Sequence, residues 1–415
     1  MRILQLHNHH AGPGGGAMEV LAHEAELLQA AGHDVDQFTL APTEQLGLSG
    51  VRAGAKAVWN VEAARGVRAR IAAFRPDVVH VHTPFPLMSP AVFRAAAAEG
   101  VPAVTTLHSH RYSCVAGTCW RDGHVCEDCV GRRLKLPGVR HRCYHDSAAA
   151  SGALTLGLVT HRALGTFHRQ VSCYLALADF SRRLLIRDGF PADRVLVKPN
   201  SVPDPGFRAE PRTDERRLVF AARLVDVKGV ATLLEAWRQV PAGMKLVIAG
   251  DGPLRPLVEQ HASTDPSIEY VGWVGEAKVL ELMAGAEAVL VPSEWYEGGL
   301  PLVALRSLSV GTPVVVTDLE NICADVLADD VGWAFPVKDS AALAGTLAGL
   351  VADPRTTRER RRRARDSYER RFSPWVNLAR LEDVYRSVTA TGSGPGSQAF
   401  RHDRFSSGAP MPGGD

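Results

Sequence analysis

The chain has 415 residues, of which 46% are hydrophobic and 22% charged, so it is long enough for about two to three domains with buried cores. Its 47 Lys and Arg residues against 45 Asp and Glu give a formal net charge of +2. This balance excludes the strongly charged surface that would indicate nucleic acid as a partner. Arginine makes up 40 of the 47 basic residues, so an isolated arginine says little about function.

The amino-terminal sequence MRILQLHNHH lacks the charged, apolar and small-residue order of a signal peptide. No run approaches the roughly 18 consecutive apolar residues that a transmembrane helix needs. We therefore expect a cytoplasmic protein without a transmembrane segment, and peripheral contact with a membrane stays open.

In the first half of the chain, short apolar runs alternate with helical patterns. The candidate strands are RILQL (2–6), DVDQFTL (34–40), VVHVH (78–82), AVTTLHS (103–109), CYLALADFS (173–181) and RVLVKPN (194–200). The amphipathic stretch between the first two strands ends on Gly32, as helices commonly do. Such alternation predicts parallel strands joined by crossover helices, and hence a doubly wound α/β domain over residues 1–203.

The segment NSVPDPGFRAEPRTDERR, which begins at Asn200, is rich in proline and charge, as interdomain linkers are. A second alternating series follows, with candidate strands at 217–224, 245–252, 268–274, 288–293 and 312–318. It predicts a second Rossmann-like domain over residues 204–372. Ligands bind beyond the carboxyl ends of parallel strands, so we expect the ligand in a central cleft that the two domains face.

The carboxyl-terminal part contains a strongly basic run, residues 355–371, and a tail of low complexity, residues 389–415. For the basic run we favour a solvated helix face over contact with nucleic acid or membrane, because single charge runs are common. The composition of the tail predicts disorder.

A glycine-rich loop, HNHHAGPGGGAMEV, follows the first strand and leads into a helix. Without side chains at Gly14, Gly15 and Gly16, the backbone can approach an anion such as a phosphate at the helix N-terminus. The Gly-Lys-Ser/Thr ending of a P-loop is absent. The second strand runs into Leu40, Ala41 and Pro42 instead of the acid of a nicotinamide fingerprint, so a nicotinamide oxidoreductase is the weaker alternative.

The second half carries the stronger pattern. Arg223 ends a strand, and Lys228 precedes an apolar-periodic helix, so two fixed cations at a strand-to-helix junction could hold a diphosphate without a metal. The next strand ends in the turn Gly250-Asp251-Gly252-Pro253, where backbone can face a flat ligand. Glu294 and Glu297 lie in a glycine-rich loop after another strand, where a carboxylate could accept hydrogen bonds from sugar hydroxyls.

Over about residues 1 to 388, the sequence resembles the retaining GT-B glycosyltransferases of family 4 (glycosyl transferases group 1) in bacteria, including enzymes of specialised metabolism. The motifs occur in the family order: GGGAMEV, PDVVHVHTP, TTLHSH, RLVDVKGV, AGDGP, PSEWYEGGLP and VGTPVV. The resemblance implies a nucleoside-diphosphate sugar donor, a small-molecule or glycan acceptor, and a final helix over residues 373–388 that crosses back to the first domain.

The resemblance also implies site residues. As catalytic groups it indicates Arg223, Lys228, Glu297 and His108. The two cations would bind the donor diphosphate, Glu297 would bind sugar hydroxyls, and His108 would lie near the donor sugar and the acceptor. A hydrogen-bonded structural role for His108 is the alternative. The further donor-binding positions are Gly15, Gly16, Gly250, Asp251, Gly252, Gly298, Gly299, Leu300 and Arg306.

Arg306 is where the chain departs from the family. The second glutamate of the family motif, which grips the nucleotide ribose, should stand there, and an arginine cannot accept hydrogen bonds from ribose hydroxyls. Either the donor sits differently, or Glu320 or another group substitutes, or activity is lost. A binding scaffold without turnover is therefore the alternative to an active enzyme. We favour activity because the diphosphate cations and Glu297 are retained.

The chemistry implied is substitution at the anomeric carbon with retention, on one face of the sugar, with the departing phosphate helping to deprotonate the acceptor. No carboxylate in the sequence stands out as a nucleophile. Such a mechanism depends on positioning and charge stabilisation, for which Asp251 and His108 are candidates. Acceptors are recognised by loops of the first domain, which the sequence leaves undetermined.

Five of the seven cysteines fall between residues 114 and 143. Cys126 and Cys129 form a Cys-x-x-Cys pair, and in a reducing compartment such clustering favours metal over disulfides. We expect a structural zinc on Cys114, Cys126, Cys129 and Cys143, with free thiols or disulfides as alternatives and with Cys119, His124 and His141 as substitute ligands. The apolar stretch that follows is expected to pack in the core.

Overall fold

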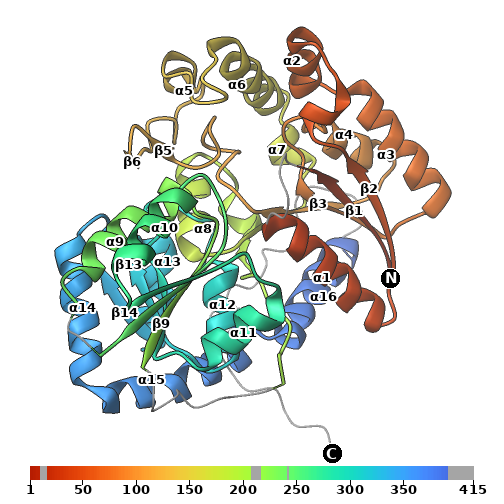
Figure 1. Ribbon diagram of the computed structural model, residues 1–415. Helices are drawn as coiled ribbons and strands as arrows, with labels where there is room; N and C mark the ends of the chain where they lie inside the picture. Colours follow the sequence, from red (N-terminus) through yellow and green to blue (C-terminus); the bar gives the residue numbers. More distant parts are fainter. Residues whose placement is uncertain (10–15, 207–215, 241–242, 391–415) are drawn as a thin grey trace, which may run out of the picture. The chain divides into compact units, whose positions relative to one another are not determined.

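A computed structural model of the chain describes residues 1–9, 16–206, 216–240 and 243–390. The chain divides into two compact units (Figure 1). Unit 1 comprises Met1–Pro199 together with the carboxyl-terminal segment from Asn377, and unit 2 comprises Asn200–Val376. The predicted domain boundary at 203/204 lies a few residues beyond this division. The tail for which we predicted disorder lies outside the described residues after Ala390.

Unit 1 contains a six-stranded sheet in the order β2-β1-β3-β4-β7-β8, and every neighbouring pair is parallel. The strands are β1 (Arg2–Asn8), β2 (Asp34–Leu40), β3 (Val78–Thr83), β4 (Ala103–Leu107), β7 (Cys173–Ala176) and β8 (Val195–Val197). All six residues of β3 and all five of β4 are buried, as expected for central strands that helices cover on both faces.

Helices cover both faces of this sheet. They are α1 (Gly16–Ala30), α2 (Gly50–Val58), α3 (Val61–Phe74), α4 (Ala91–Ala98), α6 (Ala148–Ala163), α7 (Thr166–Arg169), α8 (Asp179–Arg187) and α16 (Pro374–Ala390). Side chains of α16 join Leu28 of α1 and residues of the sheet in one apolar cluster. Tyr385 is buried there, and its hydroxyl lies 2.7 Å from His80 Nδ1 on β3. The final helix therefore packs on the first sheet, as predicted.

The cysteine-containing segment lies between β4 and α6. It holds the two-residue strands β5 (Trp120–Arg121) and β6 (His124–Val125), which pair antiparallel, and the short helix α5 (Leu136–Arg140). Asp188, directly after α8, attaches this segment to the rest of unit 1 through hydrogen bonds. Its carboxylate pairs with the buried Lys135 ammonium and accepts from the Gly131 N–H at 2.6 Å. Arg162 of α6 donates to the same carboxylate at 2.6 Å. As predicted, the apolar stretch after the cysteines contributes Leu154 and Leu158 to the core.

Unit 2 repeats the architecture with a six-stranded parallel sheet in the order β11-β10-β9-β12-β13-β14. Its strands are β9 (Arg217–Ala221), β10 (Lys245–Ala249), β11 (Ile268–Gly272), β12 (Ala288–Val291), β13 (Val314–Thr317) and β14 (Gly332–Phe335). Its helices are α9 (Val230–Trp237), α10 (Arg255–Thr264), α11 (Glu276–Ala284), α12 (Leu302–Ser309), α13 (Glu320–Ala328), α14 (Ser340–Ala352) and α15 (Pro354–Ser367). Two Rossmann-like units are thus confirmed.

The basic run forms α15 and a π-helical turn, Tyr368–Phe372. Arg355, Arg358, Arg362, Arg363 and Arg370 are exposed, as expected for a solvated helix face. Arg361 and Arg365 differ from that expectation, because they are only 7% and 8% exposed. Arg361 donates to the carbonyls of Ala286 and Ala284 at 2.7 and 2.9 Å, and Arg365 donates to Asp204 at 3.0 Å. These arginines therefore hold unit 2 together.

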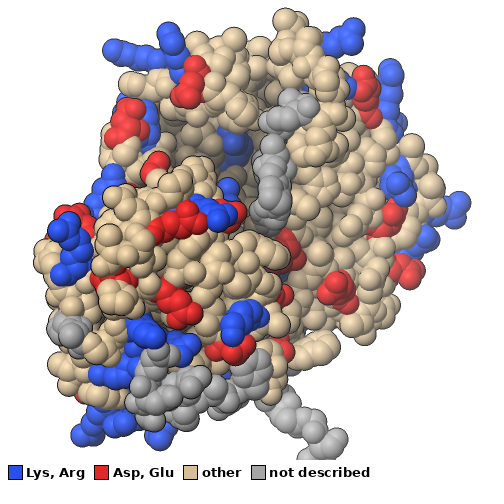
Figure 2. All heavy atoms as spheres, in the orientation of Figure 1, with Lys and Arg blue, Asp and Glu red and all other residues tan. Residues whose placement is uncertain are grey.

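The surface agrees with the near-neutral charge. Acidic and basic side chains are interspersed over most of the face shown in Figure 2. Among the described residues, no helix has the length and apolar character needed to cross a membrane.

Candidate active site

The candidate diphosphate-binding residues of unit 2 follow strand β9. Arg223 is exposed, and its side chain makes no hydrogen bond or ion pair with the described residues. Lys228 ends a 3-10 turn, Asp226–Lys228, directly before α9. Gly229 between that turn and the helix has φ +70°, and a Cβ there would lie 2.0 Å from the Pro292 carbonyl oxygen. Only glycine fits this approach, which brings Lys228 against the loop after β12.

Glu297, in that loop, is the partner of Lys228. The Lys228 ammonium donates to Glu297 Oε1, which also accepts from Trp295 Nε1 at 2.9 Å and from Ser293 Oγ at 3.0 Å. Burial alone would raise the pKa of Glu297, but the Lys228 charge and these donors hold the pKa below its ordinary value. The structure therefore joins two of the predicted catalytic residues in one ionised pair.

Glu294, the other glutamate of the loop, has a different environment. It is 8% exposed, and Oε1 accepts from Thr232 Oγ1 of α9 at 2.7 Å. Its backbone N–H donates to the Val227 carbonyl at 2.9 Å. Glu294 thus ties the loop to the turn that carries Lys228. The pattern of the loop alone did not separate Glu294 from Glu297, whereas the family resemblance indicated Glu297 only.

The turn after β10 packs against the segment that carries Arg223. A Cβ on Gly250 (φ +137°) would lie 1.9 Å from the Ala222 carbonyl oxygen, and one on Gly252 (φ +154°) would lie 2.6 Å from that of Leu224. The Leu224 N–H donates to the Asp251 carbonyl at 2.9 Å. Glycine is therefore required at both positions, because a larger residue would displace the backbone that carries Arg223. Contact of Gly250, Asp251 and Gly252 with a ligand stays a prediction.

The remaining residues predicted to bind the donor lie on or before α12 and at the start of α1. Arg306 lies on α12, where its Nε donates to Glu276 Oε1 of α11 at 2.8 Å, and its side chain is 16% exposed. Gly298, Gly299 and Leu300 precede that helix, and Leu300 is 6% exposed. Gly14 and Gly15 lie outside the described residues, whereas Gly16 is the exposed first residue of α1.

In unit 1, His108 directly follows β4 and is half-buried. Its Nε2 lies 3.0 Å from Nδ1 of His82, a residue of β3. Burial is the largest cause that lowers the pKa of His108 well below the usual value, and His82 and His7 lower it further. His108 is therefore neutral near pH 7 and suits hydrogen bonding better than charge stabilisation.

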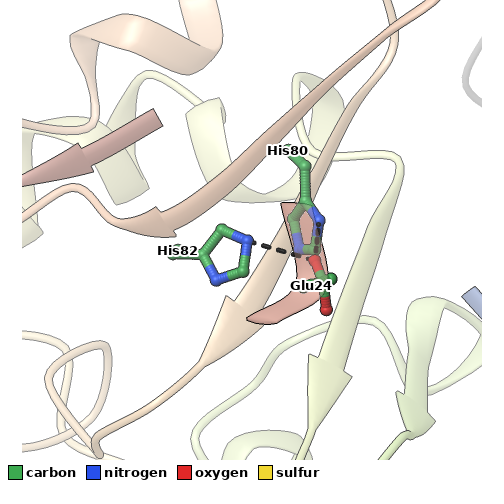
Figure 3. Close-up of side chains that lie close together, drawn as sticks. All are labelled: Glu24, His80 and His82. Atoms are coloured by element: carbon green, nitrogen blue, oxygen red, sulfur yellow. Dashed lines mark ion pairs between the residues drawn. The ribbon is translucent and has the colours of Figure 1, made fainter. Parts of the chain in front are cut away.

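A buried polar network, which the sequence did not reveal, lies behind His108. The Glu24 carboxylate of α1 faces a nitrogen of both His80 and His82 (Figure 3), with Oε1 at 3.1 Å from His80 Nδ1 and 3.2 Å from His82 Nε2. Glu24 Oε2 accepts from Lys198 Nζ at 3.0 Å. The i, i+2 spacing of HVH puts both histidines on one face of a strand, but nothing in the sequence pairs them with Glu24 or Lys198.

Possible metal ligands occur in two places. Among the residues that the structure describes, one group of three side chains has all its ligand atoms within 4.8 Å: Glu24, His80 and His82. All seven cysteines are free thiols, and the four predicted zinc ligands line one cavity of about 10 Å³, the space of about one water molecule. Their sulfurs are not gathered as tightly as in a tetrahedral zinc site, where Zn–S bonds of about 2.3 Å place sulfurs about 3.8 Å apart.

Comparison with solved structures defines the fold class. HepE of Anabaena in complex with UDP matches with a TM-score of 0.66 at 18% identity, covering 93% of this chain and 100% of that one. Sucrose-phosphate synthase of Thermosynechococcus elongatus matches with a TM-score of 0.68 at 18% identity, covering 94% and 100%. The two parallel-sheet units have the GT-B fold of glycosyltransferases.

Sequence comparison gives the family. The model of Glycosyltransferase Family 4 matches residues 14–204, and that of Glycosyl transferases group 1 matches residues 215–353. The chain is 27% identical over 403 residues to the phosphatidyl-myo-inositol mannosyltransferase of Mycolicibacterium smegmatis, covering 92% of each. It is 27% identical to the glycogen synthase of Mycobacterium tuberculosis over 316 residues, covering 74% of this chain and 67% of the relative. The chain therefore belongs to the glycosyltransferases of family 4, and these matches do not favour a nicotinamide oxidoreductase.

Proposed function

We propose that this glycosyltransferase moves a hexose from a nucleoside-diphosphate sugar to a small-molecule or glycan acceptor with retention of anomeric configuration. The observation that carries the proposal is the Lys228–Glu297 pair just before α9, five residues after Arg223, which is exposed and makes no side-chain hydrogen bond with the described residues. The exposed Arg223 guanidinium and the Lys228 ammonium, which Glu297 holds in place, suit a ligand with two negative charges and adjacent hydroxyls. Two structural neighbours, HepE with UDP and HepE with UDP-glucose, hold such ligands.

In this proposal each group has one task. Arg223 and Lys228 bind the diphosphate and stabilise the negative charge that grows on it as the bond to the anomeric carbon breaks. Glu297 keeps the Lys228 ammonium in position and accepts hydrogen bonds from sugar hydroxyls. His108 contacts a hydroxyl of the donor sugar or the acceptor. Two fixed cations supply the electrostatic stabilisation, so we propose that the chemistry needs no metal.

Retention follows if acceptor and leaving phosphate lie on one face of the sugar. The acceptor hydroxyl then forms its bond to the anomeric carbon as the carbon–phosphate oxygen bond breaks, and the hydroxyl proton passes to the departing phosphate oxygen. Protein groups in such a step position the reactants. A phosphatidyl-myo-inositol mannosyltransferase and a lipopolysaccharide outer core galactosyltransferase are among the relatives and structural neighbours, and both are compatible with a small-molecule or glycan acceptor.

Calorimetry with UDP, GDP and ADP, followed by donor hydrolysis assays with the matching sugars, tests the proposal. We expect one diphosphate to bind to the wild type, binding to weaken at least about tenfold in Lys228→Met, and turnover of its sugar nucleotide. Anomer-resolved NMR of the product tests retention. Binding without turnover on a broad acceptor panel would favour the scaffold alternative that Arg306 raised, and binding of none of the nucleotides would overturn the donor assignment.

We further propose a structural zinc on Cys114, Cys126, Cys129 and Cys143. In support, the four side chains line one small cavity. Cys126 and Cys129 also have the Cys-x-x-Cys spacing that is common among zinc ligands. Elemental analysis should find about one zinc per chain and much less in Cys126→Ser/Cys129→Ser. Well below one equivalent in the wild type would end the proposal.

A further inference from the structure

Four ionisable side chains from four separate parts of unit 1 form a continuous chain of contacts. His108 Nε2 lies 3.0 Å from His82 Nδ1, His82 Nε2 lies 3.2 Å from Glu24 Oε1, and Glu24 Oε2 lies 3.0 Å from Lys198 Nζ. Glu24, His82 and Lys198 are 6%, 2% and 3% exposed. Water therefore does not compete for their hydrogen bonds, and the protons must be arranged among these groups and His80, whose Nδ1 also lies 3.1 Å from Glu24 Oε1.

The first step in this arrangement is the charge of Glu24. Burial alone would raise the pKa of this carboxyl group, but the Lys198 charge beside it holds the pKa well below the usual range. Glu24 is therefore ionised, and an ionised carboxylate only accepts hydrogen bonds.

The second step is the proton on His82. Glu24 Oε1 and His82 Nε2 are both buried, and neither makes a hydrogen bond of good geometry with the described residues. They lie 3.2 Å apart, and Figure 3 shows the carboxylate facing the His82 ring. Without a proton, His82 Nε2 would direct a lone pair at the carboxylate charge 3.2 Å away. Because the ionised carboxylate cannot donate, the favourable arrangement places the proton on His82 Nε2. Lys198 already neutralises Glu24, so a second positive charge on His82 would be uncompensated in a buried place.

The third step follows from the neutral ring of His82. With the proton on Nε2, Nδ1 of His82 has a lone pair and can only accept. His108 Nε2, 3.0 Å away, must therefore donate, and the remaining nitrogen of a neutral His108, Nδ1, keeps a lone pair. A lone pair accepts a hydrogen bond from a hydroxyl group, whereas the opposite tautomer would present an N–H group.

The same side chains could be taken for a metal site, because the ligand atoms of Glu24, His80 and His82 lie within 4.8 Å of one another. Two contacts disfavour this. The Lys198 ammonium, 3.0 Å from Glu24 Oε2, already supplies the positive charge that a cation would bring. His80 has a partner on each nitrogen: the Tyr385 hydroxyl at 2.7 Å from Nδ1 and the Thr106 hydroxyl at 2.8 Å from Nε2.

We propose that Glu24, paired with Lys198, acts through His82 as a positioning residue that fixes the tautomer of His108, with the proton on Nε2 and the lone pair on Nδ1. The inference rests on the proposed contact of His108 with a sugar or acceptor hydroxyl. It specifies that contact: His108 Nδ1 accepts a hydrogen bond from the hydroxyl and thereby orients the oxygen for reaction or binding.

The direct test is NMR of protein with 15N-labelled histidine, in which the two tautomers have different ring-nitrogen signals. His108 is assigned by the signals that disappear in His108→Gln. We expect the Nε2–H tautomer in the wild type. In Glu24→Gln/Lys198→Met, where the charge pair is removed as a unit and the amide can donate or accept, we expect a mixture of tautomers. Glu24→Asp keeps the carboxylate and should keep the wild-type tautomer.

Kinetics separate a positioning role from a purely structural one. In the double variant, kcat should fall about 10-fold to 100-fold, as for other partners that orient a functional histidine, while KM for the donor stays within about twofold. Glu24→Asp should recover much of the lost kcat. His161→Gln is the matched control: His161 is also buried in unit 1, bonded at 3.1 Å to Thr166 Oγ1 and at 3.1 Å to the Val58 carbonyl. It should lose stability while the His108 tautomer and kcat stay unchanged.

Several results would overturn the proposal: an Nδ1–H tautomer of His108 in the wild type, an unchanged tautomer in the folded double variant, or a divalent metal present at one equivalent in the wild type and lost with Glu24. The last would replace the proton between Glu24 and His82 with a metal ion. Failure of the proposed function is distinguishable. Full kcat in His108→Ala would remove His108 from the reaction, and the tautomer spectra would still decide whether Glu24 sets its protonation.

Discussion

The polar groups of the two units are used in opposite ways. In unit 2, the Lys228 and Glu297 side chains are 17% and 15% exposed, and Arg223 is exposed and has no side-chain partner among the described residues. In unit 1, the Lys198 and Glu24 side chains are only 4% and 7% exposed. They pair with each other, and His80 and His82 contact the Glu24 carboxylate. The first set can exchange its partners for a ligand, whereas the second set has no ligand-accessible charge and can act only by holding protons and rings in place.

A cluster of ionisable residues near strand ends is therefore not by itself a binding site. Accessible cations can bind an anionic ligand. A buried ion pair instead holds one arrangement of side chains, and breaking it is costly because removing one member leaves the other charge without water or a partner. Variants that remove the lysine of each pair, Lys198 in unit 1 and Lys228 in unit 2, test this difference.

The largest expected effect is on stability, from Lys198→Met. The variant leaves Glu24 buried beside neutral histidines, and breaking a buried pair in this way costs about 3 to 5 kcal/mol. Glu24→Gln/Lys198→Met should recover most of that loss, since neither charge remains. Urea unfolding of the single and double variants measures both. A loss below about 1 kcal/mol in Lys198→Met would mean that the pair is hydrated in solution.

The next effect is on catalysis in unit 2. Arg223→Ala and Lys228→Ala should each lower kcat about 100-fold to 1000-fold, about 3 to 4 kcal/mol, as removal of a fixed donor to a developing negative charge does. Arg238→Ala, an exposed arginine at the other end of α9, is the control and should keep wild-type rates. Stability should change little in Arg223→Ala, because that side chain makes no hydrogen bond or ion pair with the part of the chain that the structure describes. Near-wild-type rates in both site variants would reject the diphosphate assignment.

Acidification should destabilise unit 1 through His80. Burial, the main cause, together with His82 lowers the pKa of His80 to about 4. As the pH falls below about 6.5, the unfolded chain binds a proton at this position and the folded chain does not until about pH 4, so stability is lost as pH falls through that window. For this group the loss between pH 7 and pH 5 is about 2 kcal/mol. Urea unfolding from pH 7 to 5 should show a steeper decline in the wild type than in His80→Gln, and equal slopes would contradict the buried neutral state.

The two units also differ in how far the sequence could predict them. Both parallel sheets follow from apolar periodicity, and Arg223, Lys228 and Glu297 stand out because each lies within a few residues of a strand end. Glu24 and Lys198 are 174 positions apart, and they meet through packing of α1 and the segment after β8 on the same sheet. Sequence spacing carries no signal for such a meeting. Likewise, the burial of Arg361 depends on carbonyls of Ala284 and Ala286, which local charge patterning cannot reveal.

A smaller effect is expected from Gly250→Ala. At φ +137°, an alanine is strained, and its Cβ would collide with the Ala222 carbonyl oxygen beside Arg223. We expect a loss of about 1 to 3 kcal/mol in stability and a lower kcat, because the backbone that carries Arg223 must shift. Gly243→Ala separates the two causes: its φ is +100°, but nothing lies within 4 Å of the added Cβ. Unfolding and kinetics should therefore show only the stability loss in Gly243→Ala. An equal fall in kcat in both would mean that the turn does not position Arg223.

The smallest expected effect is at Arg306, and it decides what the departure from the family pattern means. Its guanidinium is held by Glu276, whose side chain is 53% exposed, and such an accessible pair contributes about 0 to 1 kcal/mol. If Arg306 serves only to tie α12 to α11, Arg306→Ala should lower stability by no more than this, and Glu276→Ala should do the same. Donor affinity in calorimetry should then change less than about twofold in either variant. A clear loss of donor affinity in Arg306→Ala with none in Glu276→Ala would instead mean that the guanidinium leaves Glu276 for the nucleotide. The arginine would then have taken over, with a donor in place of an acceptor, part of the task of the family's second glutamate.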